Sequence, residues 1–231
     1  MTHQVVKFLP SSSYVEKHVE PPVPTKLSIP QWYKDYPRPE LIFDKNENSP
    51  VTNLKSCVPF LDSFTMGYVQ RTWSEITVEA QEEGIVFATR NTEPFFTKRE
   101  TSSVPIPEEF YPAEFVWRTP WTAKLPKGYS LLVTHPFNRN DLPFRTLTGI
   151  IDSDNFYHTL HGNKPFWIKK SFTGIIPVGT PMYQLIPFKR DSWKSEIEKY
   201  DEDYRRGLSL KLIQVIYNSY RKQFWTKKDF T

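Results

Sequence analysis

Short apolar runs fill the middle of the chain, and Gly, Pro and Asn separate them. The clearest series lies in residues 126–188, where Tyr129, Leu131 and Val133 fall on one face of an alternating segment. Turn residues at intervals of roughly 8–12 positions are typical of the short strands of a β-sandwich or barrel. We therefore predict a mainly β domain. Further strands are expected within residues 147–152, 166–172 and 175–188.

The same alternation begins upstream of this series. Residues 72–80 alternate apolar and polar positions, and residues 84–90 follow after a short acidic turn, which together indicate a hairpin. Residues 113–125 are also strand-like, and the Pro-rich connection at 91–112 has room for a short strand. Between two later β segments, Gly179 is expected to form a turn with positive φ.

The first 50 residues contain eight prolines, a density that excludes a long helix and interrupts most strand ladders. We predict an extended arm with one helical turn after Pro30, which would let Trp32, Tyr33 and Tyr36 dock on the body. The arm is interpreted as a clasp over a sheet face. The alternative is a segment that binds a partner.

The hydrophobic period changes at Asp191. Trp193, Ile197, Tyr200 and Tyr204 have helical spacing, which predicts a helix capped by Asp191 or Ser192 and broken at Gly207. A second amphipathic helix is expected from Leu208 to about Gln223. These helices are expected to pack on their own domain, with a second subunit as the alternative. The predicted organisation is a Pro-rich arm (1–50), a β-rich core (51–190) and a helical extension (191–231).

Composition narrows the class of protein. Aromatic residues make up 16% of 231 residues, so an aromatic-rich core is expected. The net charge of +4 comes from interspersed charges, which makes nucleic-acid binding unlikely on this count. No apolar run approaches 18 residues and the first residues do not resemble a signal peptide, so we expect a soluble, intracellular protein. The single cysteine, Cys57, excludes an intrachain disulfide and is expected to be buried.

Several motifs occur in an order that resembles the second half of the dUTPase and dCTP deaminase superfamily. They are PKGY at 126–129, then Pro136 and Arg139, then GIIDSD at 149–154, then FTGIIPVGTPMYQL at 172–185. The likeness implies a β-clip or distorted jelly-roll barrel for residues 126–188, and commonly a homotrimer with sites between subunits. The chain is also similar to uncharacterised proteins of tailed phages.

In the hydrolases of that superfamily, the resemblance assigns Asp152 to activating a water molecule that attacks a Mg²⁺-bound nucleoside triphosphate. It implies that phosphate or substrate contacts come from a small set of residues. The set is Arg139, Arg145, Asp154, Phe156 and Gln184, with Lys189 as a further candidate for phosphate.

The chain also departs from the superfamily's pattern. Residues 136–139 read Pro-Phe-Asn-Arg where the family has Pro-Arg-Ser-Gly, and Asn155 stands where a Tyr is expected, with Phe156 or Tyr157 as substitutes. Charged segments replace the Gly-rich arm that closes over the triphosphate, and residues 165–168 lack the deaminase's Glu. Preorganised phosphate donors carry much of this chemistry. The Asp-Ser-Asp-Asn sequence is therefore also interpreted as an Asx turn whose carboxylates cap backbone N–H groups.

Two other patterns carry possible chemistry. His135, His158 and His161, completed by Asp141 or Asp152, would make a two-His carboxylate metal set, as in a cupin-like oxygenase. Exposed loop histidines are the simpler explanation, and no resident metal is predicted. Residues 164–172, KPFWIKKSF, are interpreted as an edge strand protected by lysines, with single-stranded nucleic acid as the alternative.

The leading hypothesis is a noncatalytic viral protein with a β-clip fold, located in the host cytoplasm or the virion. It would act by binding or assembly, as a homo-oligomer or with other viral proteins, and without a cofactor or a membrane. The alternative is a nucleotide hydrolase that uses Asp152 and Mg²⁺, and the second alternative is the histidine-dependent metalloenzyme.

Overall fold

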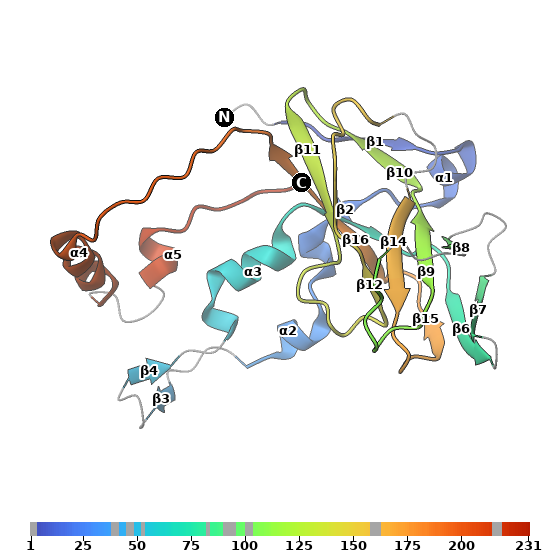
Figure 1. Ribbon diagram of the computed structural model, residues 1–231, viewed down its shortest axis with the longest axis horizontal. Helices are drawn as coiled ribbons and strands as arrows, with labels where there is room; N and C mark the ends of the chain where they lie inside the picture. Colours follow the sequence, from blue (N-terminus) through green and yellow to red (C-terminus); the bar gives the residue numbers. More distant parts are fainter. Residues whose placement is uncertain are drawn as a thin grey trace.

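Antiparallel strands form the body of the protein in the computed structural model, which confirms the prediction of a mainly β, β-clip or jelly-roll-like fold (Figure 1). The structure describes residues 4–37, 42–44, 49–51, 54–81, 84–89, 96–99, 104–157, 163–213 and 219–231. No helix among them is long and apolar enough to cross a membrane.

Three sheets make up most of this body. The largest has the order β13-β11-β16-β5-β2, the second β12-β14-β9-β8 and the third β15-β6-β7. The strands of the first are β2 (Val23–Pro24), β5 (Tyr68–Arg71), β11 (Tyr129–Thr134), β13 (Gly149–Ile151) and β16 (Pro181–Lys189). The others are β6 (Ile76–Gln81), β7 (Gly84–Thr89), β8 (Phe96–Arg99), β9 (Glu114–Arg118), β12 (Phe144–Thr146), β14 (Asn163–Ile168) and β15 (Gly174–Ile176).

The expected hairpin and strands are present with small shifts in their bounds. β6 pairs with β7 through six residues on each strand, and β8 occupies the Pro-rich connection where a short strand had room. The prediction for KPFWIKKSF was wrong, because β14 lies between β12 and β9 and is not an edge strand. Of its lysines, Lys164 is buried. An interior strand needs no protection against edge pairing, so the lysines have another role.

Aromatic side chains fill the core between the sheets, as the composition predicted. The rings of Trp117 and Phe166 stack at 3.5 Å with an interplanar angle of 5°, and Phe144 meets Trp117 edge-on at 5.1 Å. The Trp117 indole donates a hydrogen bond to Thr146 Oγ1 at 3.0 Å, which satisfies its only polar atom. The large rings therefore supply the apolar area that a chain with 38% hydrophobic residues needs.

The described N-terminal residues form a series of short elements, of which β1 (Lys7–Pro10) and β2 pair with strands of the body. β1 pairs with β10 (Trp121–Lys124), and α1 (Ser13–His18) follows with Val15 buried. The helical turn expected after Pro30 is present as α2 (Gln31–Asp35), but of its aromatic residues only Tyr33 is buried. The remaining elements of this region are η1 (Thr25–Ser28), β3 (Ile42–Asp44), β4 (Ser49–Val51), η2 (Leu54–Ser56) and α3 (Val58–Thr65).

α3 had no sequence prediction. It begins after Cys57, whose thiol is free and half-buried instead of fully buried as expected. Tyr33 packs against Phe60 and Phe64 of this helix, at ring distances of 5.9 and 5.0 Å. The N-terminal segment therefore reaches the body partly through α3.

Two glycines are required by local geometry. Gly67 has φ +73°, and a Cβ there would lie 2.2 Å from the Leu185 carbonyl oxygen of β16. Only glycine lets the turn before β5 approach the neighbouring strand this closely. Gly179 has φ +84°, which confirms the positive-φ turn expected between β15 and β16.

The C-terminal segment differs most from its prediction. Residues 190–201 form no helix, and α4 (Glu202–Ile213) begins ten residues later than expected and continues through Gly207. The Asp201 carboxylate caps α4 by accepting a hydrogen bond from the Tyr204 N–H at 2.9 Å. α5 (Ser219–Gln223) follows. Figure 1 shows α4 and α5 away from the sheets, so the predicted packing of this segment on its own domain was wrong.

The last described residues return to the body. The Trp225 indole donates to Asp62 Oδ2 at 3.0 Å, and Lys228 donates to the same carboxylate at 2.7 Å. Phe230 meets Tyr68 of β5 edge-on at 6.0 Å. Residues 191–213 and 219–224 thus lie away from the body, and residues 225–231 contact it again. We call residues 190–204 the C-terminal arm.

Candidate functional site

The GIIDSD motif forms a turn at the end of β13. The Asp152 carbonyl accepts hydrogen bonds from the N–H groups of Asn155 and Phe156, at 3.0 and 2.8 Å. This geometry agrees with the interpretation of these residues as a turn. Phe156, a candidate for substrate stacking, is 59% exposed.

Arg190, at the end of β16, joins the two carboxylates of this turn. Its guanidinium donates to both oxygens of Asp154 and, at 3.2 Å, to Asp152 Oδ1. The Asp154 side chain is only 2% exposed, and it also accepts the Gly128 N–H at 2.8 Å. The Arg190 guanidinium, helped by the Gly128 N–H, lowers the pKa of Asp154 to about 2. We call Ser130, Asp152, Asp154 and Arg190 the carboxylate clasp.

Asp152 is the exposed member of the clasp, with 62% of its side chain open to solvent. Its Oδ1 accepts from Ser130 Oγ at 2.6 Å, and Arg190 donates to the same serine at 3.0 Å. The residue that the resemblance assigns to water activation therefore shares one of its oxygens between a hydroxyl and an arginine.

Gln184 and Lys189, two further predicted site residues, make their contacts outside the carboxylate clasp. Gln184 is fully buried: it accepts the Phe137 N–H at 3.0 Å and donates to the carbonyls of Ser63 and Met66. It joins β16 to the loop after β11 and to the end of α3. Lys189 lies 2.7 Å from Asp191, whose carboxylate raises the pKa of the lysine.

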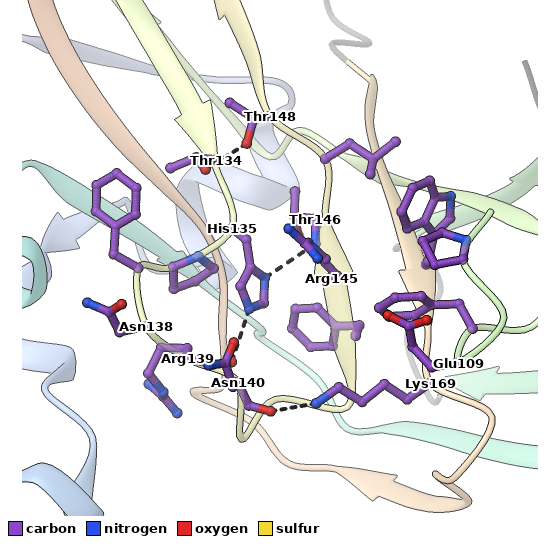
Figure 2. Close-up of a pocket in the computed structure, with 17 residues that line it drawn as sticks. Glu109, Thr134, His135, Asn138, Arg139, Asn140, Arg145, Thr146, Thr148 and Lys169 are labelled. Carbon is purple, nitrogen blue, oxygen red and sulfur yellow. Dashed lines mark hydrogen bonds between the residues drawn. The ribbon is translucent and has the colours of Figure 1, made fainter. Parts of the chain in front are cut away.

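A cleft of about 760 Å³ lies at the other end of β11. We call it the His135 cleft, and Figure 2 shows the His135 ring between Arg139 and Thr146. Segment 107–110 and β14 complete it. Its lining comprises Pro107, Glu109, Phe110, Thr134, His135, Pro136, Phe137, Asn138, Arg139, Asn140, Phe144, Arg145, Thr146, Leu147, Thr148, Trp167 and Lys169.

His135 is fixed in one tautomer. Its Nδ1 lies 3.3 Å from the Thr146 backbone N–H, which can only donate, so Nδ1 accepts and the proton is on Nε2. Nε2 then donates to the Arg139 carbonyl at 3.1 Å. Burial lowers the pKa of His135 to about 4, and the positive charges of Arg145 and Lys169 contribute to that fall. The imidazole is therefore neutral at physiological pH and both nitrogens are occupied.

The charges around this histidine are mostly positive and incompletely paired. Arg139 is held by Asp141, with Nη2 to Oδ2 at 2.8 Å. Lys169 donates to the Asn140 carbonyl, and neither Lys169 nor Arg145 has an ion pair among the described residues. Trp167, which is 8% exposed, has a buried indole N–H without an acceptor in the described part of the chain. The unpaired cations favour a ligand with negative charge.

The structure thus separates the predicted site residues into two groups. Arg139 and Arg145 line the His135 cleft, while Asp152 and Asp154 lie in the carboxylate clasp. The clasp meets β11 at Ser130 and the cleft meets it at Thr134, four residues or about 13 Å along an extended strand. Within one copy of the chain, the proposed water-activating carboxylate and the cationic residues do not form one pocket.

The described residues do not fit a protein-held metal ion. They contain no group of three or more His, Cys, Asp or Glu side chains that could bind one. Asp152 and Asp154 face Arg190, and both nitrogens of His135 make other hydrogen bonds. His158 and His161, the other members of the predicted histidine set, lie outside the described residues.

Sequence reasoning missed three residues of these sites. Arg190 is 36 residues from Asp154, and no local pattern connects them. Lys169 and Trp167 were noticed only as parts of KPFWIKKSF. Their spacing of two residues would place them on one face of β14, which is the signal that could have located the cleft wall.

The fold and the two sites define a class: a mainly antiparallel β protein of the β-clip or jelly-roll type, with a paired carboxylate turn and a cationic cleft. No protein-family model matches the chain. No curated protein matches it either.

Solved structures similar to the chain are phage dUTPases. A mutant dUTPase from phage phi11 of S. aureus, described with a structural Mg(II) ion, has a TM-score of 0.31 and 18% identity, over 71% of this chain and 96% of that one. A mutant dUTPase of Staphylococcus bacteriophage 80alpha with dUpNHpp has a TM-score of 0.30 and 18% identity, over 71% and 88%. At this similarity, the matches carry no conclusion about activity.

Proposed function

We propose that this protein is a noncatalytic viral β-clip protein that works by binding and assembly, and that it forms a homo-oligomer through its C-terminal arm. The observation that carries the proposal is the exposure of the arm's large apolar side chains. Trp193 is 90% exposed, Ile197 101% and Tyr200 77%. Large apolar side chains with this much exposure favour an interaction surface.

The carboxylate clasp supports the noncatalytic part of the proposal. Asp154 is buried against Arg190, and Asp152 is tied to the same arginine and to Ser130. A carboxylate that acts as a general base needs a water and a substrate within hydrogen-bond reach. In the clasp, Ser130 and Arg190 both bond Oδ1 of Asp152, which suits a structural role for that oxygen.

The experiment is a mass measurement by sedimentation velocity at micromolar concentration. We expect the full chain to be oligomeric, with a trimer favoured, and the variant Trp193→Ser/Ile197→Ser to become monomeric while its melting temperature stays close to that of the wild type. Leu54→Ser is the matched control, because Leu54 is 57% exposed and lies outside the arm. A monomeric wild-type protein would overturn the assembly proposal.

A nucleotide hydrolase is the second candidate. It is favoured by one observation: Arg139 and Arg145, which the resemblance assigns to phosphates, line the same cleft. The test incubates the protein with each deoxynucleoside triphosphate and Mg²⁺, follows release of pyrophosphate or ammonia, and records the thermal shift. Product formed by the wild type and lost in Asp152→Asn would establish this candidate and remove the noncatalytic proposal. Absence of product and of any thermal shift would eliminate the hydrolase candidate.

A further inference from the structure

Charge is distributed unevenly along the C-terminal region of the chain. Residues 191–203 contain six Asp or Glu against two Lys, whereas residues 204–228 contain seven Lys or Arg and no Asp or Glu. The net charge of +4 for the whole chain therefore averages two neighbouring segments of opposite sign. A local positive charge of this kind attracts polyanions even when the total charge is small. We call the described residues 205–213 and 219–228 the basic lobe.

Most cations of the basic lobe are available to a ligand. Three of them, Arg206, Lys227 and Lys228, form ion pairs. Four others have exposed side chains and no ion pair among the described residues: Arg205, Lys211, Arg221 and Lys222. Such side chains can bind phosphate groups without breaking an existing ion pair.

A contact between α4 and α5 brings the two groups of cations together. The Gln223 side chain donates to the Lys211 carbonyl of α4 at 2.8 Å. The backbone of Lys211 therefore lies beside the segment that carries Arg221 and Lys222, although ten residues or more separate them in the sequence. Figure 1 shows both helices away from the sheets, so the lobe is open to a large ligand.

Aromatic side chains accompany the cations of α5. Tyr220 and Phe224 are four positions apart and are each 43% exposed. The Phe224 N–H bonds the Tyr220 carbonyl at 2.9 Å, which closes a helical turn and places both rings on one face. The Arg221 guanidinium lies 5.8 Å from the centre of the Trp225 ring. Exposed rings beside unpaired cations suit a single strand of nucleic acid, because rings stack on bases and cations contact phosphates.

We propose that the basic lobe binds single-stranded nucleic acid, with its four unpaired cations on phosphates and with Tyr220 and Phe224 stacked on bases. Single-stranded DNA and RNA share this chemistry, since both combine a charged backbone with unpaired bases. The inference goes beyond the proposed function and does not depend on assembly, because every group that it uses belongs to one copy of the chain.

The cations of α4 are arranged in a way that disfavours a lipid surface as the partner. A helix that lies on an anionic bilayer gathers its cations on one face and its apolar side chains on the other. At about 100° per residue, Arg206 lies about 100° and Lys211 about 240° around the helix from Arg205. Cations that surround the helix suit a flexible strand, which can follow them, better than a flat bilayer.

Fluorescence anisotropy tests the proposal on the full chain, with fluorescein-labelled oligothymidylate and oligouridylate of about 20 nucleotides as probes. We expect saturable binding that weakens as salt rises. The slope of log K against log salt should be about −3, because each of four neutralised phosphates contributes about −0.7. Binding of either strand supports the proposal, and the tighter strand identifies DNA or RNA as the ligand. Absence of binding by both strands at low salt would overturn it.

Replacing the four unpaired cations by glutamine tests the phosphate contacts. We expect the dissociation constant to rise at least tenfold, and the slope of log K against log salt to move toward zero. The variant is Arg205→Gln/Lys211→Gln/Arg221→Gln/Lys222→Gln. Because all four side chains are exposed, its melting temperature should stay close to that of the wild type.

A matched control removes four positive charges elsewhere. It is Lys17→Gln/Lys98→Gln/Lys127→Gln/Lys170→Gln, at exposed lysines outside the basic lobe. This control has the same net charge as the lobe variant and should bind the probes as the wild type does. An equal loss of affinity in the two variants would mean that total charge attracts the strand, which would overturn the proposal.

Tyr220→Leu/Phe224→Leu tests the stacking. Leucine keeps apolar bulk on the lobe but has no ring, so we expect the dissociation constant to rise about tenfold while the salt dependence stays the same. An unchanged dissociation constant would overturn the assignment of these rings to bases.

Competition against the labelled strand identifies the class of partner. The competitors are a DNA duplex of the same length, polyglutamate, and vesicles that contain phosphatidylserine. All three are anionic and none offers unpaired bases, so each should displace the probe at least tenfold less well than the unlabelled single strand. Equal displacement by polyglutamate or by vesicles would indicate an acidic protein or a lipid surface and overturn the proposal. Equal displacement by the duplex would overturn it for single strands.

Discussion

The two ends of β11 handle charge in opposite ways. At the Ser130 end, Arg190 meets two carboxylates and one of them, Asp154, is buried. At the Thr134 end, Arg145 and Lys169 surround a neutral His135 and have no ion pair among the described residues. Buried ion pairs stabilise a fold. Cations that line a cleft without an ion pair remain able to bind an anionic ligand. The comparison separates, on one strand, a turn held by ion pairs from a cleft whose cations have no ion pair among the described residues.

The largest expected effect is at the buried carboxylate. Asp154→Asn removes the negative charge that Arg190 and the Gly128 N–H stabilise, and it leaves a partly buried arginine without its main partner. We expect the melting temperature to fall by several degrees. Because the pKa of Asp154 is lowered to about 2, its contribution is present at neutral pH and is lost only as pH falls from about 4 toward 2.

Asp152→Asn is the matched control for this variant. Asp152 meets the same arginine but is 62% exposed, so its ion pair is worth less than about 1 kcal/mol. Thermal melts at pH 7 should show little change. If Asp154→Asn and Asp152→Asn lowered the melting temperature equally, the distinction between a buried and an exposed member of the clasp would be contradicted.

Lys164 extends the comparison to a buried cation that has no ion pair within the part of the chain that the structure describes. Its ammonium bonds Thr119 Oγ1 and lies 4.8 Å from the Tyr183 ring centre, and burial lowers its pKa to about 7. Between pH 7 and the usual lysine pKa of about 10.4, the unfolded chain binds a proton that the folded chain does not. Stability should therefore rise by about 2 kcal/mol from pH 7 to pH 9.

Urea unfolding at several pH values measures how the free energy of unfolding changes with pH, and this dependence is the slope of interest. Lys164→Met should flatten it and raise stability at pH 7, since the apolar side chain needs no solvation. Lys170→Met, at an exposed lysine, should leave the slope as it is in the wild type. A wild-type free energy of unfolding that is flat across this pH range would show that Lys164 stays charged in the core.

The smallest effect concerns the cleft itself. His135 has a pKa of about 4, and Arg145 lowers it by charge repulsion. Arg145→Gln should raise that pKa by about half a pH unit, which an NMR titration of the imidazole resolves. In the wild type, stability should decline as pH falls from about 6.5 toward 4, because only the unfolded histidine gains a proton there. A wild-type pKa near 6.5 would mean that the ring is hydrated instead of buried.

Local signals in the sequence predicted the β architecture well. Alternation found the β6–β7 hairpin and β11, and the Gly179 turn has the expected positive φ. These features depend on neighbouring residues alone. Arg139 and Arg145, which are six positions apart in the sequence, lie in one cleft.

The arm shows where such reasoning fails. Trp193, Ile197 and Tyr200 have helical spacing, but a helix of this length draws its stability from packing of its apolar face. In one copy of the chain that face has no surface to pack against, and residues 190–201 are not helical. The Arg190–Asp154 pair escaped prediction for a related reason, since only the sheet brings β16 beside the turn.

The place of β16 has a consequence for synthesis of the chain. This strand joins β11 to β5 in the largest sheet, yet it follows them both in sequence, and β5 precedes it by more than one hundred residues. A nascent chain on the ribosome therefore cannot complete the sheet until Lys189 has emerged. Contacts between residues so far apart slow folding. The edges of β5 and β11 stay uncovered during that interval, so recruitment of chaperones to the nascent chain should end when β16 has emerged and paired.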